Sequence, residues 1–163
     1  MKFTITHAYE KDTDTVFKVL TDESYLVKKF AATGAKNIRI PECGQHSGRF
    51  VIRRQMDLPA NPPDLLKRFV KSTNFVDAVD TWQSFDKAAK TGVFEVNVKG
   101  VPISMTGTLA LKPTKKGCDY IIAFDVKCPI PLIGGKLAKL VEDDTRANQQ
   151  KDYAFTRKYL EAL

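Results

Sequence analysis

Hydrophobic and polar residues alternate along most of this chain, and a different spacing replaces the alternation near its C-terminus. The first example is residues 2–9, where Phe3, Ile5, His7 and Tyr9 fall on one side and polar residues on the other. A period of two is typical of a strand with one buried face. The pattern therefore predicts an N-terminal strand.

Two short helices are predicted after this strand. Asp12 or Asp14 can cap the first, which carries Val16, Phe17 and Leu20 on its apolar side. A second helical pattern follows, and its apolar positions and terminating glycine are Tyr25, Leu26, Phe30 and Gly34. Two helices thus interrupt the sheet early.

After Gly34 the alternation returns and continues for most of the next hundred residues. It predicts six further strands, at Lys36–Ile40, Ser47–Leu58, Thr73–Phe85, Gly92–Lys99, Ile103–Lys112 and Asp119–Cys128. Most connections between them are short, which favours antiparallel neighbours. The exception is Pro59–Phe69, whose prolines exclude strand pairing and which we expect to form a long surface loop.

From Ile133 onward the apolar residues take the spacing of a helix. This helix is expected to run for about 30 residues, or ~45 Å at the rise of an α-helix. A helix of that length must cross the whole sheet.

Length and composition indicate one domain over residues 1–163, with a core of ordinary size. The sequence has no long apolar span and no apolar leader segment, so we expect a cytoplasmic protein. Cys43, Cys118 and Cys128 are odd in number and widely spaced, which predicts free thiols.

The net charge of +7 favours contact with anionic surfaces or phosphates. The basic residues form scattered pairs, and no run of five or more occurs. We therefore expect a solvated, mildly basic surface that can approach an anionic membrane transiently, and no nucleic-acid partner.

The order of a strand, two short helices, six antiparallel strands and a long helix resembles the helix-grip fold of the START-like (SRPBCC) superfamily. The segment DTDTVFKVLTDESYLVKKF resembles the superfamily's opening, and RRQMDLPANPPD, DTWQSF and PIPLIGGKLAKLVEDD are similar to a subfamily known only as a domain of unknown function. The resemblance covers the full chain. It implies an α+β fold in which a curved antiparallel sheet of about seven strands wraps the long helix, with a cavity between them that often holds an apolar ligand. Members of the superfamily include lipid-transfer domains, hormone receptors, polyketide cyclases and chaperone activators, so the resemblance does not choose a role.

The rows of residues that should face such a cavity supply the candidate ligand-binding residues. From the strands these are Phe50, Ile52, Met56, Phe94, Val96, Val98, Met105, Leu109, Ile122, Phe124 and Val126, and from the helix Leu137, Leu140 and Val141. Each of them could equally be part of a tightly packed core. Trp82 belongs with them, either as a core residue or as a platform that stacks on a planar ligand.

Two charged residues lie in these otherwise apolar rows: Arg54 in a strand and Asp144 in the helix. A buried charge needs a partner or a ligand. Either each residue lies at an exposed end of its element, or one of them binds a ligand head group. Arginine would suit a carboxylate or a phosphate.

The joint before the long helix, CPIPLIGGKLAKLVEDD, contains Gly134 and Gly135. It lacks the hydroxyl residue of a phosphate-binding loop and follows an antiparallel strand. The glycines either satisfy the sterics of the turn or form a flexible entrance to the cavity, where Lys136 could meet an anionic head group.

Three functions follow as hypotheses. The first is binding or carrying of a hydrophobic small molecule or lipid. The second is a cyclase, dehydratase or hydrolase-like enzyme that uses His7, Arg54, Asp80 or Asp144, although the sequence has no catalytic motif and we assign no catalytic residue. The third is a protein-interaction module that uses Pro59–Phe69. Cys43 and His46 are too few ligands for a zinc site, so neither a metal nor a cofactor is expected.

Overall fold

The computed structural model describes residues 1–163, and its helices and strands follow the order read from the sequence pattern. The elements are β1 (Lys2–Tyr9), α1 (Thr13–Leu20), α2 (Glu23–Ala32), β2 (Lys36–His46), β3 (Arg49–Pro59), the 3₁₀ turn η1 (Asp64–Leu66), β4 (Thr73–Ser84), β5 (Lys90–Val98), β6 (Ser104–Pro113), β7 (Cys118–Lys127) and α3 (Gly134–Glu161). No helix combines the length and apolarity needed to cross a lipid bilayer.

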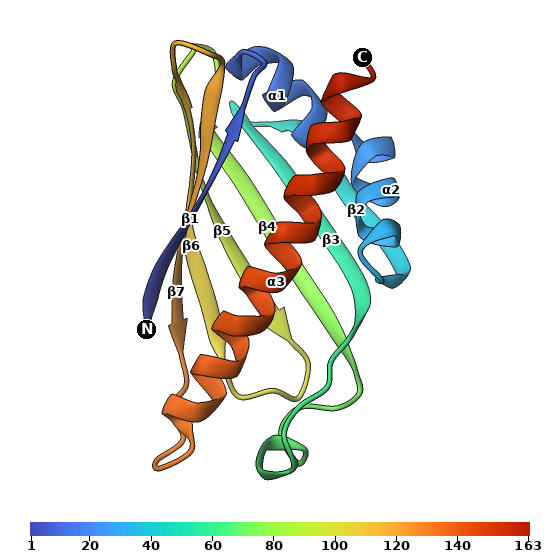
Figure 1. Ribbon diagram of the computed structural model, residues 1–163, viewed down its shortest axis with the longest axis vertical. Helices are drawn as coiled ribbons and strands as arrows, with labels where there is room; N and C mark the ends of the chain where they lie inside the picture. The colour runs from blue at the N-terminus through green and yellow to red at the C-terminus, as the bar shows by residue number, and fades with distance from the viewer.

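The seven strands form one antiparallel sheet in the order β1-β7-β6-β5-β4-β3-β2. The N-terminal strand β1 forms one edge of the sheet and pairs with β7, for example at Phe3 and Phe124. Figure 1 shows α3 lying diagonally across the hollow face of the curved sheet, with α1 and α2 near one end of it. The predicted α+β helix-grip fold is confirmed.

The helix starts follow from side-chain caps. Asp12 accepts a hydrogen bond from the backbone N–H of Thr15 at 2.8 Å, and Asp22 accepts one from that of Tyr25 at 2.9 Å. Of the two aspartates considered for the first cap, Asp12 is therefore the one used. Asp14 instead lies in the first turn of α1 and pairs with Lys90.

The main boundary error is in β2, which continues to His46 rather than ending at Ile40. Its pairing with β3 contains two register shifts, and Pro41 lies within the irregular stretch. An edge strand tolerates proline and bulges, because one side of it needs no ladder partner. The alternation of apolar and polar residues is interrupted in this stretch, but the pairing of β2 with β3 resumes at Glu42 and continues to His46.

Two hydrophobic clusters attach α3 to the sheet. The larger contains Ala138 and Leu160 of α3 together with residues of α1, α2 and the sheet. A smaller one, at the other end of the molecule, joins Leu137 to Leu66 of η1 and to the loop residues Val70 and Val101. In α3 the fully buried residues lie near its two ends, and none lies between residues 139 and 155. The middle of the helix covers a space that side chains do not fill.

Candidate ligand-binding cavity

A cavity of about 200 Å³ lies between the hollow face of the sheet, α2 and the middle of α3. Its wall is mainly apolar, with Leu20, Leu26, Phe30, Met56, Leu58, Val76, Ala78, Trp82, Phe94, Val96, Met105, Leu109, Ile122 and Phe124 among the lining residues. The strand residues come from alternate positions, because a strand directs every second side chain to the same face. Apolar walls with a few polar groups are typical of small-molecule sites.

The central charged group of the cavity is an ion pair between β3 and β4. Arg54 Nη1 lies 2.8 Å from Asp80 Oδ1, and the two side chains are only 18% and 19% exposed. Arg54 is paired in the sheet with Ala78, whose small side chain leaves space beside the guanidinium. Burial opposes the charge on Arg54, but the nearby Asp80 carboxylate offsets it and raises the pKa of the guanidinium.

Asp80 accounts for only part of the donor capacity of Arg54. The other N–H groups of the guanidinium have no protein acceptor. Every side-chain nitrogen or oxygen that is fully buried in the structure does have a hydrogen-bond partner, so these unpaired groups are not fully buried. Those groups are therefore accessible, and Arg54 lines the cavity. A guanidinium with free N–H groups can donate to a carboxylate or phosphate.

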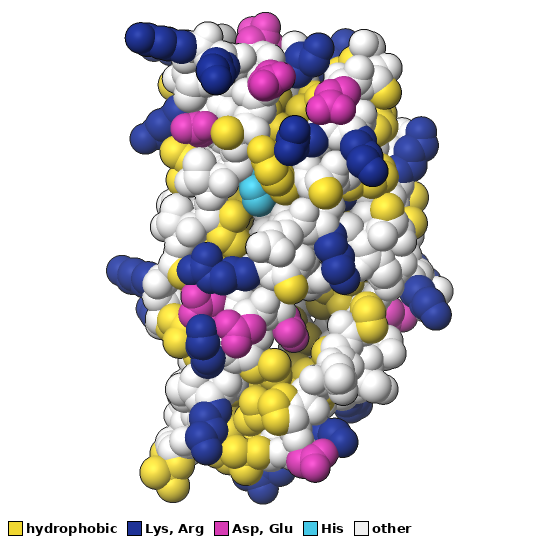
Figure 2. All heavy atoms as spheres, viewed as in Figure 1, with side chains coloured by type: hydrophobic (Ala, Val, Ile, Leu, Met, Phe, Trp, Pro, Cys, Tyr) yellow, Lys and Arg dark blue, Asp and Glu magenta, His cyan; other side chains and the backbone are white.

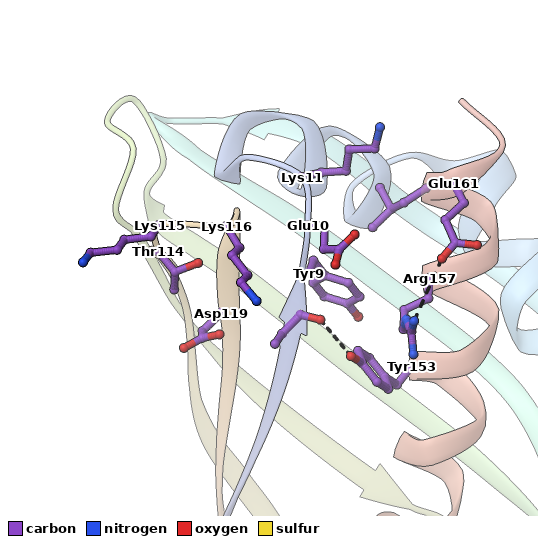
Figure 3. Close-up of a pocket in the computed structure, with 12 residues that line it drawn as sticks. Tyr9, Glu10, Lys11, Thr114, Lys115, Lys116, Asp119, Tyr153, Arg157 and Glu161 are labelled. Carbon is purple, nitrogen blue, oxygen red and sulfur yellow. Dashed lines mark hydrogen bonds and ion pairs between the residues drawn. The ribbon is translucent and has the colours of Figure 1, made fainter.

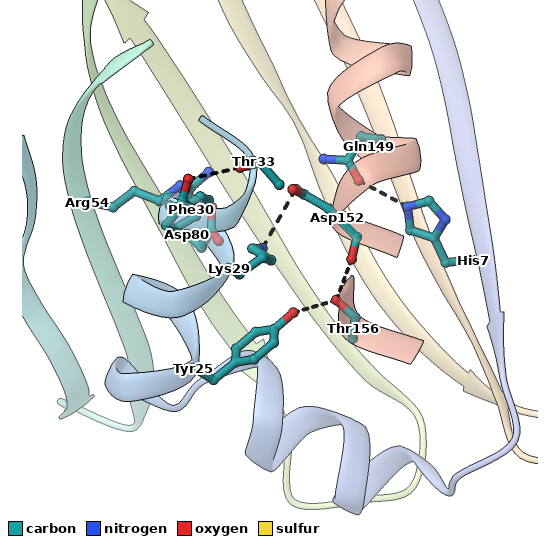
Figure 4. A network of polar contacts seen from close by, with 10 residues as sticks. All are labelled: His7, Tyr25, Lys29, Phe30, Thr33, Arg54, Asp80, Gln149, Asp152 and Thr156. Atoms are coloured by element: carbon teal, nitrogen blue, oxygen red, sulfur yellow. Dashed lines mark hydrogen bonds and ion pairs between the residues drawn. The ribbon is translucent and has the colours of Figure 1, made fainter. Parts of the chain in front are cut away.

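The side of the cavity formed by α3 is polar. Figure 4 shows Gln149, Asp152 and Thr156 directed from α3 toward residues of β1 and α2. The side-chain pairs across the gap are His7 Nε2 with Gln149 Oε1 at 3.0 Å, Lys29 Nζ with Asp152 Oδ2 at 3.7 Å, and the Tyr25 hydroxyl with Thr156 Oγ1 at 2.5 Å. Thr156 already donates to the carbonyl of Asp152, so Tyr25 is the donor in the last pair. These contacts attach α3 to the rest of the fold without filling the space.

His7 is a buried histidine of this polar side. Its ring stacks on Tyr153 with centroids 4.7 Å apart, and burial lowers its pKa below the usual value of 6.5. The ring is therefore mainly neutral at pH 7, and Nε2–H donates to Gln149. The wall also contains Tyr9 and Tyr120, whose pKa values are raised by burial, so both hydroxyls stay protonated.

Most of the candidate ligand-binding residues of the strands line this cavity: Arg54, Met56, Trp82, Phe94, Val96, Met105, Leu109, Ile122 and Phe124. Trp82 is 2% exposed, so it belongs both to the packed core and to the cavity wall. His7 and Asp80, considered for acid–base chemistry, line it too. The structure thus brings the inward rows of the strands together around one space.

The other strand candidates lie outside the cavity wall. Phe50 packs with Phe17 and Phe85, with ring centroids 6.0 and 6.3 Å apart. Ile52 and Val126 are core residues, and Val98 packs against the smaller cluster. These side chains are part of the packed core, which was the alternative to a place in the cavity wall.

None of the candidates in α3 lines the cavity. Leu137 belongs to the smaller cluster and Leu140 packs against it, while Val141 packs against the larger cluster and Asp144 is exposed to solvent. The glycines at 134 and 135 form the first turn of α3, and no residue from 131 to 136 lines the cavity.

Sequence reasoning missed the residues of α1 and α2 that line the cavity, several strand residues, and all of the polar residues that α3 contributes. Thr145, Gln149, Asp152 and Thr156 recur at helical spacing and form one stripe facing the sheet. The predicted inward face of the helix was the apolar stripe that begins at Leu137, because apolar periodicity is the usual sign of a packed face. The recurrence of polar residues every three or four positions was the sequence signal that could have identified this face of α3.

A second groove, of about 700 Å³, lies beside the C-terminal end of α3 (Figure 3). The Tyr153 hydroxyl donates to the carbonyl of Ala8 on its inner side. A groove with charges of both signs is less suited to an apolar ligand than the cavity between the sheet and α3. The charged residues that line it are Lys11, Lys115, Lys116 and Arg157 with Glu10, Asp119 and Glu161.

A family model described as "Protein of unknown function (DUF2505)" matches residues 4–160. A search of curated proteins found no match. The family model covers almost the whole chain, including every residue of the cavity wall.

Solved structures share the fold at low sequence identity. The protein TTHA0849 of Thermus thermophilus is 14% identical with a TM-score of 0.65, and the match covers 99% of this chain and 98% of that one. A STAR-related lipid transfer protein of Xanthomonas axonopodis is 16% identical (TM-score 0.62; 98% and 85% covered), and human STARD10 is 15% identical (0.63; 98% and 64%). These matches confirm the START-like fold inferred from the sequence, and at such identities they show the fold alone.

Proposed function

The chain belongs to the DUF2505 family, and we propose that it binds a hydrophobic small molecule or a lipid in the cavity between the sheet and α3. The observation that carries this proposal is the apolar cavity itself, with an arginine that keeps free N–H groups in its wall. The Xanthomonas protein of the same fold is named a lipid transfer protein, which supports the same class of ligand.

Affinity would come chiefly from the apolar wall. Burial of apolar ligand surface contributes about 25 cal/mol per Å² before the costs of association. The volume of about 200 Å³ is below the roughly 300–1,000 Å³ of sites for drug-sized ligands, so a whole lipid requires α2 or α3 to move away from the sheet. A single acyl chain or a small ring system is a better match for the cavity in its present form.

Orientation would come from Arg54. An acidic head group placed beside the guanidinium can accept from the N–H groups that Asp80 leaves free, while the apolar part extends along the wall toward Met56 and Val76. The proposed ligand class is therefore an apolar molecule with one carboxylate or phosphate.

The fluorescent fatty acid cis-parinaric acid provides a direct test, because Trp82 can transfer excitation energy to it from the cavity wall. We expect saturable quenching of Trp82, and weaker binding of the methyl ester than of the acid. Replacing Arg54 with Met should remove that preference. Native mass spectrometry of the purified protein should show a retained apolar ligand.

A matched pair of substitutions locates the binding. Ala78→Phe places a ring in the cavity, whereas Ala110→Phe adds the same ring on the β6 position that faces away from it. We expect the first to abolish binding and the second to leave it intact, with circular dichroism showing that both fold. Equal binding by the two variants would contradict the proposal.

Acid–base catalysis on a bound ligand is the second candidate, and one observation favours it: His7, Arg54 and Asp80 all reach the cavity. A neutral imidazole beside protonated tyrosines can exchange a proton with a substrate. Under this alternative, His7→Gln would keep ligand binding and prevent conversion of a co-purified substrate, monitored by mass spectrometry. Unchanged ligand after prolonged incubation with the wild-type protein would leave binding as the function.

A further inference from the structure

The positive charge of the protein is concentrated at one end. Three segments, residues 59–72, 98–104 and 127–139, together contain seven exposed cationic side chains and one carboxylate, that of Asp64. The segments themselves therefore carry a net charge of +6, and Asp125, Glu142 and Asp143 just outside them pair with Lys127 and Lys139. The cationic residues are Lys67, Arg68, Lys71, Lys99, Lys127, Lys136 and Lys139.

The three segments meet in space. Leu66 and Val70 from the first, Val101 from the second and Leu137 from the third form the smaller hydrophobic cluster. A shallow groove lined by Leu65 and Lys136, among others, runs between η1 and the first turns of α3. In Figure 2 hydrophobic side chains gather at the lower end of the molecule, with Lys and Arg side chains around them. We refer to this end, made of the three segments, as the basic tip.

Two exposed leucines project from the basic tip. The Leu132 side chain is 99% exposed and that of Leu65 is 52% exposed. Leu132 also has a φ of +69°, a left-handed conformation that costs an L-residue about 1–2 kcal/mol. The turn that holds it there is closed by a hydrogen bond from the Gly134 N–H to the carbonyl of Ile130 at 2.9 Å.

We propose that the basic tip docks on anionic lipid bilayers, with Leu132 and Leu65 entering the interface and the cationic side chains contacting lipid phosphates. An apolar side chain surrounded by lysines matches the two forces that attract peripheral proteins to such membranes, apolar burial and electrostatic attraction. This surface is separate from the cavity, so docking and ligand binding can succeed or fail independently.

Nucleic acid is the other polyanion that a basic surface could bind, and the side chains favour a membrane. Binding of single-stranded nucleic acid relies on exposed aromatic platforms. The one aromatic ring in the basic tip, Phe69, is half-buried, and the Arg68 guanidinium lies over it at 4.7 Å from the ring centroid. The projecting residues are aliphatic, which suits acyl chains.

Co-sedimentation with vesicles tests the proposal. The wild-type protein should bind vesicles of phosphatidylcholine with 30% phosphatidylserine and should not bind pure phosphatidylcholine. The double variant Lys99→Glu with Lys136→Glu should weaken binding roughly ten- to a hundred-fold, because each basic residue near an anionic membrane contributes about 1 kcal/mol of attraction. Neither lysine is in an ion pair, so the fold should be unaffected.

The control applies the same change of charge at the opposite end of the sheet. Lys115→Glu with Lys116→Glu alters the β6–β7 turn and should lower binding less than about threefold, an effect of net charge alone. Equal losses in the two double variants would overturn the proposal, since attraction would then depend on total charge.

The leucines give an independent measurement. Leu132→Ser with Leu65→Ser should reduce binding at least about tenfold even at 0.5 M salt, where electrostatic attraction is screened. Unchanged binding, or tight binding of a 20-nucleotide RNA with none to vesicles, would overturn the proposal. Binding of cis-parinaric acid by all these variants should remain normal, which separates failure of docking from failure of the proposed ligand function.

Discussion

Arg54 and Asp80 face each other diagonally across β3 and β4, with Nη1 and Oδ1 2.8 Å apart inside an otherwise apolar wall. Each strand contributes one charged residue to a row of hydrophobic ones. The pair keeps a guanidinium charged in the cavity without a ligand, because Asp80 offsets the cost of its burial. The cavity therefore has a fixed charged group in its wall before any ligand enters.

Breaking this pair should cost stability. Asp80→Asn leaves Arg54 without a countercharge and should lower the free energy of unfolding by about 2 kcal/mol, below the roughly 3–5 kcal/mol of fully buried pairs because water reaches both groups. Urea denaturation measures the change. The double variant Arg54→Met with Asp80→Leu should recover most of it, since both charges are then removed. Additive losses in the double variant would show that the two side chains do not act as a pair.

The stability of the protein should fall between neutral and mildly acidic pH because of His7. Burial lowers the pKa of its imidazole in the folded state, so the unfolded chain binds a proton more readily below its usual pKa of 6.5. The loss begins as pH falls through 6.5 and is complete below the folded-state pKa. The nearby Asp152 acts against the shift, and Lys29 acts with it.

Urea denaturation at pH 7.5 and 5.0 measures this effect. His7→Gln should reduce the difference in unfolding free energy between the two pH values. His46→Gln is the matched control, because His46 is exposed on the edge strand β2 and should leave the difference as in the wild type. A wild-type pH dependence retained in the His7 variant would contradict this assignment.

Lys90 is a buried lysine that should be essential for stability rather than for ligand binding. Its ammonium donates to Asp14 Oδ1 at 2.6 Å and to the carbonyls of Phe85 and Lys87 at 2.9 and 2.7 Å, and the side chain is 2% exposed. Lys90→Met should lower the unfolding free energy by about 1–3 kcal/mol, because two carbonyls lose their donor. Lys87→Met, at an exposed position, should change it by less than about 0.5 kcal/mol. Chemical denaturation of the two variants gives the comparison, and equal losses would show that the buried contacts of Lys90 are not the cause.

Gly134 and Gly135 should respond oppositely to alanine. A Cβ on Gly134 would lie 2.8 Å from the carbonyl oxygen of Cys128, so Gly134→Ala should destabilise by about 1–3 kcal/mol. A Cβ on Gly135 would meet nothing within 4 Å, so Gly135→Ala should stabilise the first turn of α3 by up to ~1 kcal/mol. Thermal unfolding of the two variants provides the comparison, and a loss of stability in both would show that the close approach at Gly134 is not the cause.

Most of the fold could be predicted from the sequence, because the local spacing of apolar residues determines where the strands and helices lie. Alternation located every strand to within a few residues except β2, whose end at His46 follows from pairing with β3 through two register shifts. Alternation also identified the inward rows correctly, since Phe3, His7 and Tyr9 are all buried. Such rows follow from strand geometry alone.

The site was predictable only in part, because a cavity depends on where one element crosses another. Phe94 and Ile52 both face inward, yet Phe94 lines the cavity and Ile52 does not. Asp144 was a candidate and Asp152 was not considered, although the two lie only about two turns apart on α3. The position of the helix axis relative to the sheet decides that Asp152 faces the gap. The polar repeat of α3 marks one face of the helix, but it does not show that this face covers a cavity.

The distribution of buried residues in α3 has a mechanical consequence. Leu137 and Ala138 fix one end of the helix and Thr156 and Leu160 fix the other, while the turns between them have no fully buried side chain. Between these ends the helix is held by the polar side chains of Gln149 and Asp152 and by the ring of Tyr153, which stacks on His7. A movement of the middle of α3 away from the cavity would therefore break polar and aromatic contacts, while the apolar packing at both ends of the helix stayed in place.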